Sequence, residues 1–331
     1  MMTSGFERAF RGIFLFRLSA IFIFFFLFFT PKLATAKPIV WQAQKGGAVF
    51  TLFGSIHLGS PNFYPLPELV EDKFDKADAL IVEVDLASSK VPAFPDRRNS
   101  YQSLNVKEKR LLETVAAKAR VDLSLLYAMQ PWQTAVTLQM EQAKSLGLRP
   151  DFGVDRHFLQ KSSSTGKRII GLESLEQQFS TLTTMEDNGK AMLLETIEDW
   201  DQKRLDLACM ISAWRQGDHK TLTAMSNYFA EYSSLEDRVL YQRNLKWISL
   251  LQDKNKFPDG NYLLVVGDLH FHGKRGLLAL LEKEGFSIKR LTSGGSVNCF
   301  SSAGRMNQSA NTSSQRYQGE VDLASVLAQK Y

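Results

Sequence analysis

Two histidines occupy matched places in this chain, each three residues after a glycine that ends an apolar run. His57 follows a run that stops at Gly54, and His270 follows one that stops at Gly267. A single G-x-x-H pattern would carry little information in a chain with 21 glycines and 5 histidines. Two such patterns, each after an apolar run of strand length and roughly two hundred residues apart, indicate one structural device used twice.

Two carboxylates also follow apolar runs of strand length. Residues 78–86 contain four consecutive apolar residues before Glu83 and Asp85, which is typical of a buried parallel strand. Residues 168–172 predict a short strand before Glu173. In open α/β sheets, ligands bind beyond the carboxyl ends of the strands, because the loops converge there. If the four predicted strands are neighbours, two imidazoles and one or two carboxylates meet at one edge of the sheet.

The chemistry of such a group would be metal-assisted hydrolysis. His57, His270 and Glu83 form a ligand set suited to a divalent Mn, Zn, Co or Fe ion with open positions for water and substrate. A bound metal lowers the pKa of its water from 15.7 toward about 7, which produces a nucleophile at neutral pH. Glu83 is therefore expected as a metal ligand or catalytic base, and Glu173 as a second catalytic carboxylate that transfers protons.

Other residues give weaker signals, and for each of them a structural role is the simpler interpretation. His272 is expected on a solvent-exposed loop, and His219 in a surface turn. Asp155 and His157 either lie beside the site or lie on a helix without a role in the site. Ser55 lies inside the first G-x-x-H, but it lacks the G-x-S-x-G elbow of serine hydrolases. The four strand-end residues are themselves, taken singly, each more often loop residues bonded to backbone than functional groups.

The elements that must position these residues predict an α/β fold. Residues 39–44 and 48–53 predict a hairpin, residues 68–77 an amphipathic helix, and residues 78–86 the next strand. This β-α-β order implies a parallel sheet with a right-handed crossover. Helical patterns then fill a large insertion at about residues 104–254. We therefore expect a mixed, largely parallel sheet that is flanked by helices and carries a helical insertion.

Both ends of the chain differ from the predicted α/β domain of residues 37–292. The first 36 residues predict a cleavable signal peptide, with a basic start, an apolar stretch at residues 18–29 and small residues before a cut after Ala36. A retained membrane anchor would need roughly 20 apolar residues, and Arg17 interrupts the stretch. The mature protein is thus expected in the periplasm or secreted, without a stable membrane span. Residues 293–331, rich in Ser, Asn, Gln and Gly, are expected to form a disordered tail.

Charge and cysteine content limit the remaining possibilities. The formal charge is +5, but four basic residues and one acidic residue in the first 36 leave about +2 after cleavage, which argues against nucleic acid as a partner. The apolar fraction of 44% is that of an ordinary globular protein. Export would allow a bridge between Cys209 and Cys299, whereas the apolar helical surroundings of Cys209 are equally consistent with a buried free thiol.

Ordered sequence blocks run along most of the mature chain. They are LFGSIHLG at residues 52–59, YPLP at 64–67, EVDL at 83–86, GVD at 153–155, GLE at 171–173 with EQ at 176–177, RN at 243–244 with Trp247, VGDLH at 266–270, and GLL at 276–278 with Leu281. In this order they resemble the TraB/GumN family over about residues 48–291. The ordered set is much more specific than either G-x-x-H pattern alone.

This resemblance implies a fold like that of erythromycin esterases and ChaN-type haem-binding proteins, a sheet with helices on both sides and a helical insertion. The family also includes the Tiki metalloproteases, which cleave secreted signalling polypeptides. By the same resemblance, His57, Glu83 and His270 map onto the two motif histidines and the glutamate of a metal-dependent active site. Asp268 departs from the small residue that the family pattern has there, so the resemblance leaves the local charge open.

These observations favour an exported metal-dependent hydrolase, with peptides as the leading substrate class and a metal-bound water as the nucleophile. One alternative is a non-catalytic periplasmic protein that binds haem, a metal or a small ligand in the same cleft. A second alternative is a metal-free esterase with His57 as the base. The partner is a peptide or a small molecule in each case, and the sequence leaves open the metal, the substrate and the oligomeric state.

Overall fold

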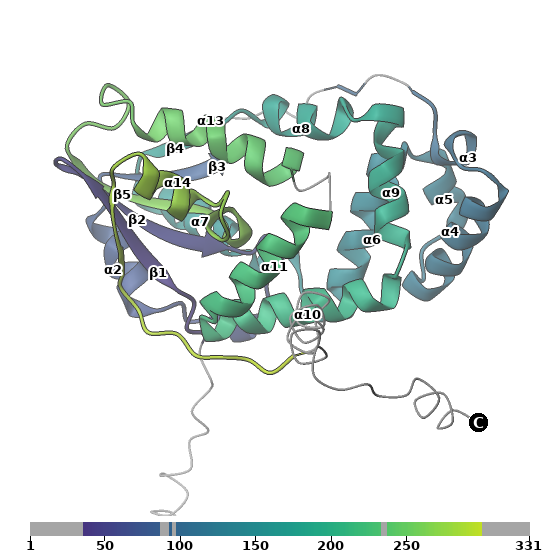
Figure 1. The fold of residues 1–331 in the computed structure, drawn as a ribbon, viewed down its shortest axis with the longest axis horizontal. Coiled ribbons are helices and arrows are strands. Elements are labelled where there is room, and N and C mark those ends of the chain that lie inside the picture. Colours follow the sequence, from purple (N-terminus) through teal and green to yellow (C-terminus); the bar gives the residue numbers. More distant parts are fainter. Residues whose placement is uncertain (1–35, 87–92, 95–96, 233–236, 300–331) are drawn as a thin grey trace, which may run out of the picture. The chain divides into compact units, whose positions relative to one another are not determined.

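The computed structural model describes residues 36–86, 93–94, 97–232 and 237–299 (Figure 1). Residues 1–35 of the predicted signal peptide and residues 300–331 of the predicted tail lie outside this part of the chain. The signal peptide, the tail and the domain boundaries therefore stay predictions. None of the helices in the described ranges is long and apolar enough to cross a membrane.

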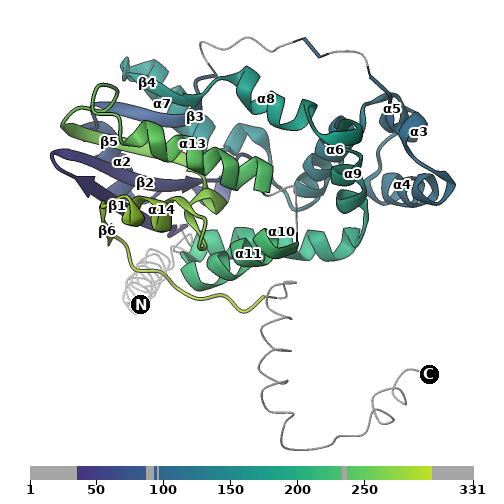
Figure 2. The same ribbon diagram turned by 45° about the horizontal axis from the view of Figure 1, so that its top comes forward.

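A six-stranded mixed sheet forms the core of the fold, with the strand order β4-β3-β5-β2-β1-β6. The strands are β1 (Val40–Lys45), β2 (Ala48–Ser55), β3 (Ala79–Val84), β4 (Ile169–Glu173), β5 (Gly260–Gly267) and β6 (Ser287–Arg290). Strands β4, β3, β5 and β2 run parallel, whereas β1 and β6 pair antiparallel at one side (Figures 1 and 2). The predicted α/β class with a mixed, largely parallel sheet is confirmed.

The register of the parallel strands aligns their carboxyl ends. Ser55 at the end of β2 lies opposite Gly267 at the end of β5, and Val84 of β3 lies opposite Glu173 of β4. Each of these strands delivers a candidate residue at or just beyond its last positions. The loops that follow β2 and β5 therefore start at the same edge of the sheet, although their motifs lie at opposite ends of the chain.

Alternation of side chains along the strands divides the core into two layers. Leu263 and Val265 of β5 face one layer, and Leu264 and Val266 face the other. A strand that is buried on both faces needs a continuous apolar run, which explains the run that precedes the second motif.

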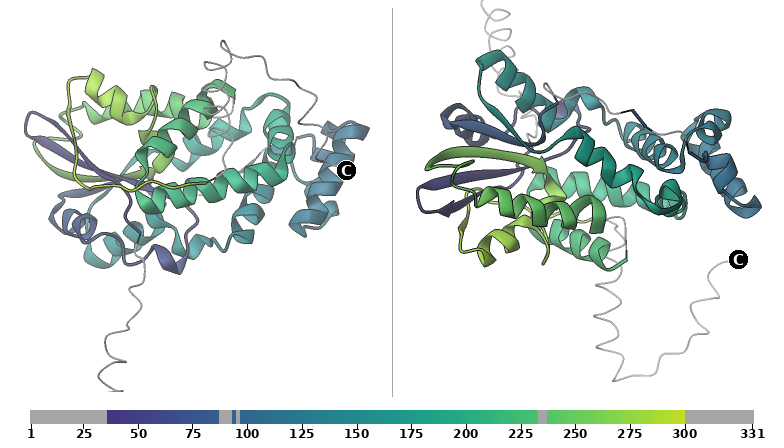
Figure 3. Two further views of the ribbon diagram at one scale, coloured as in Figure 1. Left: turned by 60° about the horizontal axis from the view of Figure 1, so that its bottom comes forward. Right: turned by 90° about the horizontal axis from the view of Figure 1, so that it is seen from above.

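Helices cover both faces of the sheet (Figure 3). The first layer lies under α2 (Glu68–Lys76), α7 (Val154–Thr165) and α10 (Trp200–Gln216), and its aromatic side chains are Phe53, Phe63, Phe74, Phe158 and Trp214. The second layer lies under α13 (Gln242–Leu251) and α14 (Leu277–Lys283), and its aromatic side chains are Phe50, Trp247, Phe257, Tyr262, Phe271 and Phe286.

A third apolar cluster belongs to the helices beyond the sheet edge. These are α4 (Val106–Ala119), α5 (Leu123–Ala128), α6 (Pro131–Ser145), α8 (Leu175–Thr183) and α9 (Lys190–Ile197), with α3 (Ser100–Ser103) packed beside α5 and α6. Leu112, Trp132, Leu138 and Leu193 are buried in this cluster. Helix α11 (His219–Tyr232) packs instead against α10, where Met225 lies beside Cys209. The expected insertion at residues 104–254 is not continuous, because α7 packs on the sheet and β4 pairs with β3 within it.

A disulfide joins Cys209 of α10 to Cys299, with 5.5 Å between the two Cα atoms. The same C-terminal segment also pairs with the end of α10, where the Gly295 amide donates to the Gln216 carbonyl oxygen at 2.7 Å. The bridge is therefore the correct interpretation of the two cysteines, and the free thiol is wrong.

Candidate functional site

The first motif is held at the end of β2 by contacts from other elements. The Trp214 indole donates to the Gly54 carbonyl oxygen at 2.9 Å, and the Val154 amide donates to the Ile56 carbonyl oxygen at 3.0 Å. Gly54 has to lack a side chain, because a Cβ atom there would lie 1.8 Å from Oδ1 of Asp268 in the second motif. The two G-x-x-H segments therefore pack directly against each other.

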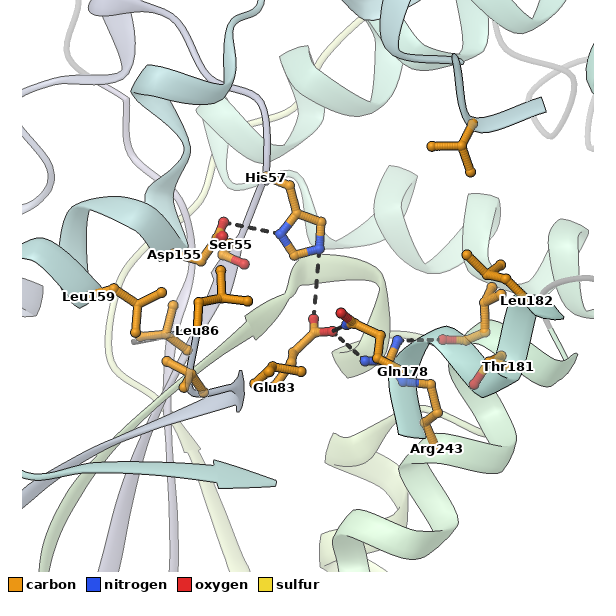
Figure 4. Close-up of a pocket in the computed structure, with 15 residues that line it drawn as sticks. Ser55, His57, Glu83, Leu86, Asp155, Leu159, Gln178, Thr181, Leu182 and Arg243 are labelled. Atoms are coloured by element: carbon orange, nitrogen blue, oxygen red, sulfur yellow. Dashed lines mark hydrogen bonds and ion pairs between the residues drawn. The ribbon is translucent and has the colours of Figure 1, made fainter. Parts of the chain in front are cut away.

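His57, Glu83 and His270 meet beside Gly267. Nε2 of His57 lies 3.9 Å from Glu83 Oε1, a contact that Figure 4 shows, and Nε2 of His270 lies 3.8 Å from the same oxygen. Glu83 Oε1 also accepts a hydrogen bond of 2.7 Å from the Gly267 amide. The structure thus brings together the three residues that the sequence groups as metal ligands.

His270 is buried and its ring is fixed in one orientation. The Asn244 amide nitrogen donates to the carbonyl oxygens of His270 and Arg275, each at 3.1 Å, so its Oδ1 faces the imidazole. Nδ1 of His270, 2.6 Å from that oxygen, is therefore the protonated nitrogen, and Nε2 keeps its lone pair. Burial lowers the pKa of His270 to about 3. At neutral pH this imidazole is uncharged.

His57 has the opposite environment. Its side chain is 57% exposed, and Nδ1 lies 3.1 Å from Oδ1 of Asp155 in the first turn of α7. Partial burial lowers the pKa of His57, but the Asp155 carboxylate and, more weakly, Glu83 outweigh that effect and raise it to about 9. At neutral pH this imidazole carries a proton unless another cation takes its place.

Arg243 of α13 is the shared partner of both candidate carboxylates. Its guanidinium pairs with Glu83 and with Glu173, whose Oε1 lies 2.5 Å from Nη2 and whose Oε2 accepts from Nε at 3.1 Å. Nη1 lies 3.4 Å from His270 Nε2. Burial raises the pKa of Glu173, and the guanidinium opposes that shift. Glu173 is thus linked to Glu83 through Arg243.

The ionised state of Glu83 depends on these neighbours. Burial would raise the pKa of this carboxyl, but the Arg243 guanidinium, the protonated His57 and the Gly267 amide hold it below its ordinary value. Gln178 of α8 also donates to Glu83 Oε2 at 3.2 Å. Both carboxylate oxygens are therefore occupied, and Oε1 is the one that faces the imidazoles.

Sequence reasoning missed the roles of Arg243 and Asn244, and it left Asp155 as a flanking residue or helix decoration. Arg243 lies 160 positions from Glu83 in the sequence, so no local spacing could relate them. The signal that could have found them is the RN block, where adjacent helical residues reach Glu83 and His270.

Two weaker expectations are wrong, namely an exposed loop for His272 and a surface turn for His219. His272 is 1% exposed instead of lying on an open loop, because its Nε2 contacts Asp268 Oδ2 at 2.9 Å. Its Nδ1 lies 3.1 Å from Nδ1 of His219, which is half-buried. Asp268, the departure from the family pattern, therefore pairs with a buried histidine. His157 pairs with Glu71 at 2.9 Å.

The residue types at the site, two imidazoles and a carboxylate, are ones that bind divalent metals in proteins. Metal-binding histidines normally donate their second ring N–H to an oxygen acceptor, as His270 does toward Asn244, and Nδ1 of His57 faces the Asp155 carboxylate at 3.1 Å. With neutral imidazoles, the three carboxylates and one guanidinium leave a formal charge of −2. However, no group of three His, Cys, Asp or Glu side chains in the described ranges has the arrangement of a metal centre. The 3.8 and 3.9 Å separations exceed the ~3.4 Å of a tetrahedral site.

His57, Glu83 and Arg243 line a cavity of ≈ 480 Å³, whereas the buried His270 is not among its lining residues in the described part of the chain. Its apolar wall includes Leu86, Leu159 and Leu182 (Figure 4). Ser55, which is 2% exposed, also lines this cavity, and its hydroxyl has no hydrogen-bond partner among the residues that the structure describes. A buried hydroxyl without a partner is costly unless a bound molecule satisfies it. The cavity therefore has the size and the polar group expected of a ligand site.

Comparisons with known proteins agree with the sequence blocks. The TraB/PrgY/gumN family matches the chain over residues 39–290. The protein YbaP of Escherichia coli is 34% identical over 248 residues, which cover 74% of this chain and 92% of YbaP. YbaP of Shigella flexneri is 34% identical over 234 residues, which cover 70% of this chain and 86% of that protein. Both relatives are described as uncharacterized, and no solved structure matches the chain. The chain belongs to the TraB/PrgY/gumN family.

Proposed function

We propose that this protein is a hydrolase of peptide bonds that uses a divalent metal, with His57, Glu83 and His270 at the reacting centre. The observation that carries the proposal is the approach of two imidazole Nε2 atoms to one carboxylate oxygen, at 3.9 and 3.8 Å. The proposal includes export to the periplasm or outside the cell.

The residues would divide the work according to their surroundings. His270 would offer a lone pair on Nε2 that Asn244 keeps available. His57 would offer one on Nε2 after that nitrogen loses its proton, while Nδ1 keeps its proton toward Asp155. Glu83 receives a proton from the attacking water or shares in holding the cation. A divalent ion bound there would lower the pKa of a water toward about 7.

Elemental analysis of the purified protein, beside peptide hydrolysis assays, tests the proposal. The wild type should retain about one Mn, Zn, Co or Fe ion per chain. His57→Ala and His270→Ala should lose both the metal and about 10²- to 10⁴-fold in turnover. His157→Ala, which removes a histidine outside the cavity lining, is the matched control. Full activity in a chelator-treated double variant would rule the mechanism out.

A metal-free esterase with His57 as base is the second candidate. The Arg243 guanidinium lies 3.4 Å from His270 Nε2, where it repels a cation and can instead stabilise a developing oxyanion. Activity that survives chelation but not His57→Ala would select this mechanism. Tight retention of haem or another ligand, without turnover of any peptide or ester, would instead identify a binding protein.

A further inference from the structure

A second cavity, of ≈ 630 Å³, adjoins the candidate site. Residues of α6, α9, α10 and α11 line it, together with the loop that follows β2. His57 and Val136 line both cavities, so the imidazole stands between them. A molecule that passes His57 can therefore occupy both cavities.

The apolar part of the second cavity is adaptable. Met140, Met210 and Met225 line it beside Tyr228 and Phe229. Methionine side chains are flexible and polarisable, and surfaces rich in them accept apolar side chains of different shapes. This wall suits a polypeptide segment better than one small molecule of fixed shape.

The charged part of the same wall is acidic. Glu195, Asp199 and Asp206 line the cavity, and Lys203 is its one ammonium group among the described residues. Asp199 stands at the start of α10, but its side chain makes no capping hydrogen bond there. Glu195 lies in the last turn of α9, close to the partial negative charge of the helix end, and that turn contains no basic residue. A positive group in this cavity would be attracted by the three carboxylates, which outnumber the repelling charges of Lys203 and the protonated His57.

We propose that the second cavity binds a segment of a polypeptide substrate in which a lysine or arginine stands beside an apolar residue. The inference rests on the proposed hydrolase function and specifies its substrate. Since the unpartnered Ser55 hydroxyl marks the first cavity as a ligand site, substrate occupies both sides of His57. Cleavage then takes place within a chain and not at its end.

Fluorescence anisotropy with two labelled peptides tests the charge preference. The peptides share length and apolar residues and differ only in a central lysine or glutamate. The lysine peptide should bind about tenfold more tightly at low salt, the order expected for two partly screened ion pairs. The double variant Glu195→Gln, Asp199→Asn should remove the preference, and Glu195→Lys, Asp199→Lys should reverse it.

The matched control is Glu198→Gln, which removes a neighbouring carboxylate that does not line the cavity. It should leave the preference unchanged, and circular dichroism melts should show that every variant folds. Equal binding of both peptides, or a preference that survives the neutral double variant, overturns the inference. Spermine binding as tightly as the lysine peptide also overturns it, because a polyamine lacks the apolar side chains.

Mass spectrometry of the same peptides separates this inference from the proposed function. Cleavage of both peptides at similar rates, without a preference for the lysine peptide, would support the hydrolase function and overturn the acidic subsite. Tighter binding of the lysine peptide without any cleavage would support the acidic subsite and overturn the hydrolase function. Internal cleavage near the lysine supports both.

Discussion

The two G-x-x-H segments place their histidines on the same carboxylate and then give them opposite properties. His57 is largely exposed and keeps its proton beside Asp155, whereas His270 is buried and neutral beside Asn244. The motif therefore determines where each imidazole stands. Their surroundings determine the protonation states: the Asp155 carboxylate of α7 raises the pKa of His57, whereas burial lowers the pKa of His270, whose tautomer Asn244 of α13 fixes.

Exchanging the partner of the first histidine tests this difference most strongly. Asp155→Asn should lower the pKa of His57 from about 9 toward the ordinary 6.5, because the neighbouring negative charge is lost. If His57 acts in turnover, activity should fall about 10²- to 10⁴-fold, since the ring is no longer oriented by a carboxylate. Proton NMR titration of the metal-free protein measures the pKa.

Asp151→Asn provides the control for that titration, because this exposed carboxylate pairs with Arg149 and Arg156. A pKa of His57 that stays near 9 in Asp155→Asn would contradict the assignment of Asp155 as the residue that holds the proton.

The two motif glycines differ in the space around them. Gly54→Ala places Cβ 1.8 Å from Asp268 Oδ1, whereas Gly267→Ala places it 3.2 Å from Glu83 Oε1. We expect Gly54→Ala to lower the free energy of unfolding by about 3 kcal/mol and Gly267→Ala by about 1 kcal/mol, because overpacking costs more where the backbones are closest. Urea denaturation measures both. Equal losses would mean that the two segments do not pack as described.

Giving the second histidine a charged partner is the reverse exchange. Asn244→Asp should raise the pKa of His270 above about 3, because a carboxylate then faces Nδ1. It also removes the amide that donates to two carbonyl oxygens, at a cost of about 2 kcal/mol in unfolding free energy. NMR titration and urea denaturation report the two effects. Asn255→Asp, on an exposed turn, is the control.

The last comparison concerns the stability of the metal-free protein as a function of pH. Between about pH 3 and 6.5 the unfolded chain binds a proton at His270 that the folded chain does not, so stability falls on acidification. Between 6.5 and about 9 the folded chain keeps a proton on His57 that the unfolded chain loses, so stability falls as pH rises. Thermal melts should show His270→Ala flattening the acid limb and His57→Ala the alkaline limb. Identical profiles in both variants would contradict this division.

Much of the fold follows from local patterns, whereas the charges of the site do not. Continuous apolar runs such as 262–266 predict buried parallel strands, and their polar ends predict where His57, Glu83 and His270 gather. The pairing of Glu83 with Arg243 depends on how α13 packs over the sheet, which no spacing encodes. His272 was misjudged for the same reason, because Asp268 reaches it only through the turn that follows β5.

The disulfide makes one covalent ring of the polypeptide between Cys209 and Cys299, 90 positions apart. His270 and helix α13, which carries its partner Asn244, lie inside that ring, while His57 and Glu83 lie outside it. A single proteolytic nick within the ring leaves both fragments tethered until a reductant opens the bridge. In an oxidising environment rich in proteases, a nicked molecule would thus still carry both histidines on one covalent assembly.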